Sequence, residues 1–230
     1  MCPYEANLWV NFPKLWITPG RRFETRQTQA VRWDDLFDDL ASQFDAGLEE
    51  ERRRALIDEE RLRVSRLTTR DRLSALASTL QPDEHIGLQL HSGDRVDIVP
   101  VEIGADWLGA DLVGPAHRYG ACLIALGGIG ALLLTPEQVA RSMQPMSERA
   151  GGLSARLGFG IALRDLARRR LACEFSTRLG VVYGTVDRVG RDHLDIAVHD
   201  PEVPRRASAV ITTRILPLDD LLVVRIRTTD

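Results

Sequence analysis

Apolar residues follow a helical spacing in the first well-patterned part of the chain. One apolar face recurs at steps of three or four positions, as an α-helix requires, and consists of Trp33, Leu36, Phe37, Leu40 and Phe44, with Leu48 following. In the next run, Glu49 to Arg54, carboxylates precede arginines by three or four positions, so surface ion pairs favour a helix that continues toward Ser65. The apolar face is expected to dock a partner helix or to pack on the chain's own β structure.

A different pattern begins after this arm. A short helix is predicted over residues 69–80 and ends before Pro82, because proline lacks a backbone N–H and biases the preceding residue toward extended geometry. Alternating apolar and polar residues then predict strands over residues 86–90, 96–103, 107–113, 121–126 and 131–134. Five short strands at this spacing are typical of a small β-barrel.

The same order of elements recurs after a linker. Residues 135–154 contain two prolines and paired glycines around one modest helical stretch. Helical spacing then covers residues 153–170, and strand-like sequence begins at Leu171. The predicted organisation is an extension (1–30), a helical arm (31–66), a first barrel (67–134), a linker (135–154) and a second barrel (155–230).

An internal repeat accompanies this order. A shift of 86 residues places Ile103-Gly104-Ala105-Asp106-Trp107-Leu108 on Val189-Gly190-Arg191-Asp192-His193-Leu194. A shift of 92 places Ile124 on Leu216 and Leu132 on Val224. The glycine before the aspartate is expected to form a tight turn with positive φ.

A short helix, five strands and a Gly-x-Asp turn between the second and third strands resemble the Sm-like family of SH3-type barrels. The likeness covers residues 69–134 and 155–227 and implies RNA binding and ring assembly. The residues that carry RNA contacts in that family are mostly missing, since the asparagine positions lie near Ala110 and Ile196. The loop before the last strand is Gly127-Gly128 in one copy and Asp219-Asp220 in the other, where carboxylates repel phosphate.

A second resemblance is to a family of actinobacterial proteins that have no established activity. It rests on Arg32-Trp33-Asp34, Gly104-Ala105-Asp106 and Pro217-Leu218. Residues 1–30 share neither periodicity nor composition with the rest of the chain, and Val31 matches a GTG start codon. We expect these thirty residues to be upstream sequence translated by mis-annotation or a flexible tail.

Charge is distributed unevenly along the chain. Residues 31–66 carry 7 basic and 11 acidic groups, whereas residues 156–227 carry 13 and 9. The arginines that form the predicted basic surface are Arg164, Arg168, Arg169, Arg170, Arg178, Arg188, Arg191, Arg205 and Arg206. Such a surface can bind nucleic acid or dock an acidic helix.

Candidate chemistry is sparse. The five histidines lack metal-ligand spacing, the three cysteines form no CxxC, and Gly127-Gly128-Ile129-Gly130 is not followed by the Lys-Ser/Thr of a phosphate loop. Neither a nucleophile motif nor a run of about 18 apolar residues occurs. We therefore expect no enzyme activity, cofactor, metal, small-molecule substrate or membrane contact, and a cytoplasmic location.

These observations predict an α+β chain of tandem Sm-like or SH3-type barrels behind an amphipathic helical arm. The expected function is non-catalytic binding or assembly, through a protein partner or self-association. The alternative is a nucleic-acid-binding regulatory protein that uses the arginine-rich second barrel.

Overall fold

The computed structural model describes residues 33–114, 119–145, 152–201 and 206–227, without the side chains of residues 33–35, 119 and 207. The chain forms two compact units, Met1–Leu56 and Ile57–Asp230. The hypothesis about residues 1–30 concerns a segment outside the described residues. The first unit contributes the amino-terminal part of one long helix, and the second contains the β structure.

The described residues form four α-helices, several of which have clear end signals. Their bounds are α1 Trp33–Ser65, α2 Thr69–Thr79, α3 Pro136–Ser142 and α4 Phe159–Arg169. Thr68 and Asp71 form a reciprocal capping box at the start of α2. The single helix predicted over residues 153–170 is instead a 3-10 turn, Leu153–Arg156, followed by α4, because Gly158 is extended and caps the second helix.

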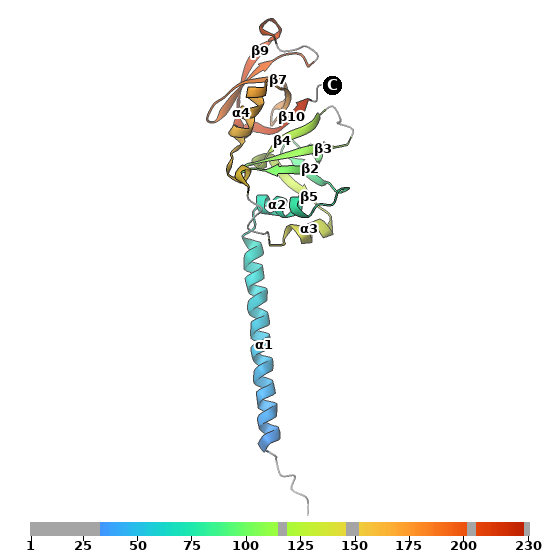
Figure 1. Cartoon of the computed structure of the whole chain (residues 1–230), viewed down its shortest axis with the longest axis vertical. Coiled ribbons are helices and arrows are strands. Elements are labelled where there is room, and N and C mark those ends of the chain that lie inside the picture. Colours follow the sequence, from blue (N-terminus) through green and yellow to red (C-terminus); the bar gives the residue numbers. More distant parts are fainter. Residues whose placement is uncertain (1–32, 115–118, 146–151, 202–205, 228–230) are drawn as a thin grey trace, which may run out of the picture. The chain divides into compact units, whose positions relative to one another are not determined.

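Ten strands form one antiparallel sheet (Figure 1). Their bounds are β1 Ile86–Leu90, β2 Arg95–Ile103, β3 Trp107–Val113, β4 Tyr119–Ala125, β5 Ile129–Leu133, β6 Ala172–Thr177, β7 Gly180–Val189, β8 His193–Val198, β9 Thr212–Pro217 and β10 Leu221–Arg227. The spatial order is β5-β1-β2-β3-β4-β10-β6-β7-β8-β9. The first five strands lie within two residues of their predicted bounds.

The prediction of two separate small barrels is wrong. The structure has one continuous open sheet, in which β4 pairs with β10 and thereby joins the two halves. A strand edge with unpaired N–H and C=O groups needs a partner, and β4 finds that partner in β10 rather than within its own half. The two halves are therefore hydrogen-bonded to each other through β4 and β10, and neither half closes into a barrel.

The two halves nevertheless have the same strand order and matching registers. Leu88 pairs with Leu132 in the first half as Phe175 pairs with Val224 in the second. The ladder of β3 with β4 matches that of β8 with β9, and β2 and β7 carry bulges at corresponding positions. The repeated unit is thus a five-stranded half-sheet, not an independent barrel.

The Gly-x-Asp turns are alike in the two halves, but their glycines do not have the predicted positive φ. The N–H of Gly104 donates to the carbonyl of Trp107 at 2.8 Å, as that of Gly190 donates to the carbonyl of His193 at 2.8 Å. Among the described glycines only Gly93, Gly114 and Gly180 have positive φ. The reason for glycine is the aromatic ring three residues later: a Cβ on residue 104 would lie 2.0 Å from Nε1 of Trp107.

Two apolar cores lie against the sheet, and β10 contributes to both. Leu222 and Val223 pack into the core of the first half, which also contains Leu73 and Leu76 of α2. Leu221 and Val224 pack into the core of the second half together with side chains of α4. Residues 221–224 of β10 are therefore buried on both faces of the strand, two in each core. The packing of either half thus depends on β10.

Candidate functional site

The predicted partner-helix face is exposed along α1. The side chains are exposed by 39% at Leu36, 63% at Phe37, 41% at Leu40, 71% at Phe44 and 52% at Leu48. Trp33 belongs to the same helix, but its side chain lies outside the described residues. An apolar face of this length on a helix is unusual for a surface in water unless another surface covers it.

Charge along the same helix is segregated. Residues 33–48 carry five aspartates and no basic residue, and they are followed by Glu49-Glu50-Glu51 and then Arg52-Arg53-Arg54. Within the helix, Glu50 contacts Arg53 at 3.7 Å and Arg54 at 3.0 Å. Such exposed pairs add little stability, so the arginines remain available to carboxylates of another chain.

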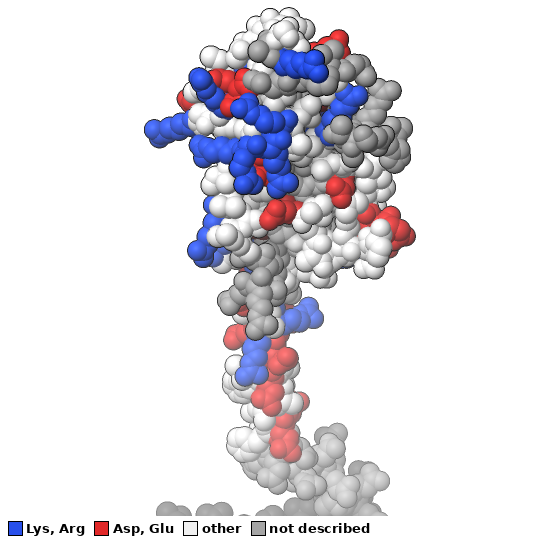
Figure 2. All heavy atoms as spheres, turned by 45° about the horizontal axis from the view of Figure 1, so that its top comes forward, with Lys and Arg blue, Asp and Glu red and all other residues white. Residues whose placement is uncertain are grey.

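The arginines of the predicted basic surface differ in how they are paired with carboxylates. The arginines that the structure describes there are all exposed, and Figure 2 shows basic side chains gathered with carboxylates among them. Arg168 and Arg169 each contact Asp165 at 2.6 Å, and Arg170 contacts Asp187 at 3.0 Å. Arg205 lies outside the described residues, and Arg206 precedes a 3-10 turn.

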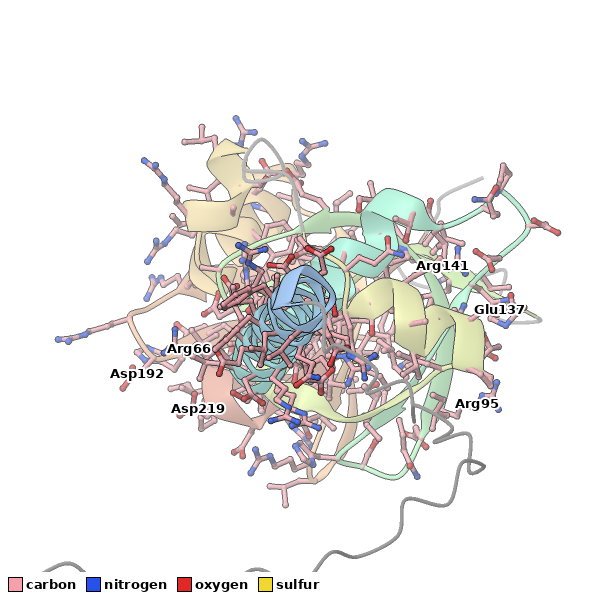
Figure 3. The ribbon with its side chains drawn as sticks, turned by 90° about the horizontal axis from the view of Figure 1, so that it is seen from below. Arg66, Arg95, Glu137, Arg141, Asp192 and Asp219 are labelled. Atoms are coloured by element: carbon pink, nitrogen blue, oxygen red, sulfur yellow. The ribbon has the colours of Figure 1, made fainter. Side chains whose placement is uncertain are left out.

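Three of the arginines converge on an open groove of about 800 Å³. Arg164 comes from α4, Arg178 from the β6–β7 turn and Arg191 from the β7–β8 turn. The groove also contains Asp106, Asp192 and Asp219, the last two of which lie on the same side of the molecule in Figure 3. Arg164 donates to the carbonyl of Gly190 at 3.4 Å.

Two of the three carboxylates in this groove, those of Asp106 and Asp192, form hydrogen bonds with neighbouring residues. Asp106 accepts the backbone N–H of Phe159 at 2.6 Å, which ties the first half to the start of α4. The hydrogen bond between Asp192 and His193, 2.8 Å long, lowers the pKa of the aspartate. With three arginines facing three aspartates, the groove has no strong net charge.

Sequence reasoning missed the groove because its residues come from turns that are far apart along the chain. Asp106 and Asp192 are equivalent positions of the repeat: their carbonyls accept the N–H of Leu126 at 2.9 Å and of Leu218 at 2.8 Å. Both residues line the groove, and the repeat alignment could have paired them. Both turns come together because β4 pairs with β10, a contact between residues that are distant in the sequence.

A smaller groove of about 410 Å³ lies between α4 and the strands β3 and β4. Trp107 lines it and donates from Nε1 to the carbonyl of Leu157 at 2.8 Å. Cys122 also lines it, but burial raises the pKa of this thiol to about 12. A neutral, buried thiol is a poor nucleophile, so the residue is suited to packing.

The described residues hold no group of three or more side chains that could bind a metal ion. His199 is buried, with Nε2 3.0 Å from Oγ1 of Thr185 and Nδ1 3.0 Å from the carbonyl oxygen of Asp200. His117 lies outside the described residues. None of the described helices has the length and apolar character that crossing a membrane requires.

Comparisons of the chain with protein-family models, with curated proteins and with solved structures find no match.

Proposed function

We propose that this chain is a non-catalytic assembly protein whose helix α1 associates with α1 of a second copy. The exposed apolar face of Leu36, Phe37, Leu40, Phe44 and Leu48 is the observation that carries the proposal. Burial of apolar side chains is worth roughly 25 cal/mol per Å², and this face has the helical spacing that a partner helix matches.

The charge pattern favours an antiparallel arrangement of the two helices. If the copies run in opposite directions about Phe44, Asp34 and Asp35 lie opposite Arg54 and Arg53 of the second copy, whereas Asp38 and Asp39 lie opposite Glu50 and Glu49. A parallel pair would instead place the aspartates of both copies side by side, and like charges at such distances repel.

Light scattering on the full chain tests the proposal. Replacing Phe37 and Phe44 by glutamine removes two of the most exposed apolar side chains of the face, so we expect the association through α1 to be lost. The matched control is Leu179→Gln in the β6–β7 turn, where the side chain is 93% exposed. An unchanged mass in the double variant, or an equal loss in the control, would overturn the proposal.

Nucleic-acid binding is the second candidate, and three arginines of the predicted basic surface favour it. Among the described residues, Arg178, Arg188 and Arg191 have no carboxylate within ion-pair distance. Arginines without such partners are available to phosphate. The nearby Asp192 and Asp219 weigh against it.

A further inference from the structure

We propose that copies of the chain also join head to tail, with β9 of one copy pairing antiparallel with β5 of the next. This proposal concerns the two ends of the sheet and does not rest on the association of α1. The strand order leaves β5 and β9 as the edge strands of the described sheet. Each therefore offers a row of backbone groups to another strand.

The junction inside the chain supplies the geometry. β4 pairs with β10 across the boundary of the two halves. In the repeat, β9 occupies the place of β4, because Leu194 pairs with Leu216 as Leu108 pairs with Ile124. Likewise β5 occupies the place of β10. The free edges at the two ends are thus the counterparts of the two strands that already pair.

This equivalence fixes a register between copies. Within the chain, Val224 lies opposite Leu123 and Arg225 opposite Cys122. The counterparts between copies are Leu132 opposite Ile215 and Leu133 opposite Arg214. Because a slip of one residue would turn every side chain to the other face, the register is a specific claim.

Exposure of apolar side chains at both edges agrees with this partner. Ile215 is 67% exposed, whereas its counterpart Leu123 is partly buried against the core of the second half. Leu133 is 38% exposed at the other edge. Edge strands of isolated proteins usually carry charges or proline, as β9 does at Arg214 and Pro217. Ile215 between them is nevertheless exposed, and pairing would cover it with Leu132 of the next copy.

Space beside β5 matches the needs of such a junction. An open groove of about 320 Å³ runs along β5 and is also lined by Thr69 and Arg72 of α2. At the corresponding place in the second half, α4 lies beside β4 and both line the smaller apolar groove. The groove at β5 leaves room for the side chains that β9 of another copy would bring.

Lysine substitutions at the two edges test the proposal by light scattering. The full chain carrying Phe37→Gln and Phe44→Gln serves as the parent, so that α1 does not contribute. Ile215→Lys places a charge against the core around Leu132, and Leu133→Lys faces Arg214, so each should abolish association. Leu179→Lys, at a 93% exposed turn position, is the matched control and should assemble like the parent.

A mixture gives the decisive result. The Ile215→Lys variant keeps an intact β5 edge and the Leu133→Lys variant keeps an intact β9 edge, so the two together should form a heterodimer although each alone is a monomer. The proposal fails if the parent is a monomer, if the mixture stays monomeric, or if Leu133→Lys alone still associates, which would indicate symmetric pairing of β9.

Cysteine cross-linking covers the case in which a lysine variant does not fold. Leu133→Cys and Arg214→Cys change exposed positions, and a Cys2→Ser background removes the cysteine outside the described residues. We expect a mixed disulfide when the two variants are combined, and none when Thr212→Cys replaces Arg214→Cys. Absence of the first product or presence of the second contradicts the register. A lower mass of the Phe37/Phe44 variant that still exceeds the mass of the monomer would bear only on α1.

Discussion

Gly104 and Trp107 are in direct van der Waals contact, since a Cβ on Gly104 would lie 2.0 Å from Nε1 of the indole. The hydrogen bond from Nε1 to the carbonyl of Leu157 holds the ring in this position. The glycine of the Gly-x-Asp turn is therefore required by the packing of an aromatic ring and not by backbone conformation.

Gly104→Ala is expected to destabilise the chain by about 1 to 3 kcal/mol, because the buried Trp107 ring must move to make room for a methyl group. Urea unfolding followed by tryptophan fluorescence measures the change. Gly127→Ala is the control, since a Cβ there meets nothing within 4 Å. Equal effects of the two substitutions would contradict the packing argument.

Asp106→Ala should lower the free energy of unfolding by about 1 to 2 kcal/mol, because the first N–H of α4, on Phe159, loses its acceptor. The equivalent change in the second half, Asp192→Ala, removes a bond to exposed His193 and should have a smaller effect. Denaturant titration of both variants checks the difference. A larger effect at Asp192 would argue against the bridging role of Asp106.

Stability should decrease as the pH falls below about 4, the ordinary range of an aspartate, and Asp71 should contribute to this decrease. Hydrogen bonds from Thr68 lower the pKa of Asp71 in the folded chain. A carboxyl with a depressed folded pKa stabilises the fold above its unfolded pKa, and that contribution is lost as the pH falls through the folded value. Thermal melting at several pH values should show a shallower dependence in Asp71→Asn. Thr68→Val should reduce the dependence in the same direction, and an unchanged slope in both variants would refute the assignment.

Cys122 and Cys173 should resist alkylation in the folded chain at pH 8. Both thiols are buried, and burial raises the pKa of each to about 12. Mass spectrometry after iodoacetamide treatment should find both unmodified until denaturant is added. Rapid modification of either cysteine under native conditions would show that its surroundings open.

The nucleic-acid candidate predicts a strong salt dependence of binding. If Arg178, Arg188 and Arg191 contact phosphates, replacing all three by glutamine should reduce the slope of log affinity against log salt by about 2 to 3. Fluorescence anisotropy with a single-stranded oligonucleotide measures the slope. The matched variant replaces Arg168 and Arg169, which already contact Asp165. No binding at low salt would end this candidate.

The local elements could be predicted from the sequence, but the way they combine could not. Alternating residues such as Ile86, Leu88 and Leu90 located β1, and the helical spacing from Leu36 to Leu48 located α1. These patterns depend only on neighbours along the chain. The wrong prediction of separate barrels arose because pairing between strands is set by contacts that are distant in sequence.

One signal of the joined sheet was present in the sequence. Leu221-Leu222-Val223-Val224 is a continuous apolar run, which is typical of a strand buried on both faces, and the structure buries all four residues. The sequence carries no comparable signal that Arg178 and Arg191 meet at one groove, because turn residues show no periodicity. Their convergence with Arg164 depends on how β6, β7 and α4 pack.

The position of β10 has a consequence for synthesis on the ribosome. Leu222 and Val223 complete the core of the first half, yet they are translated about 90 residues after β5 ends at Leu133. At roughly 5 to 20 residues per second, the nascent first half waits for several seconds with its apolar surface uncovered. Emergence of β10, rather than of the first five strands, is therefore the moment at which either half acquires its complete interior.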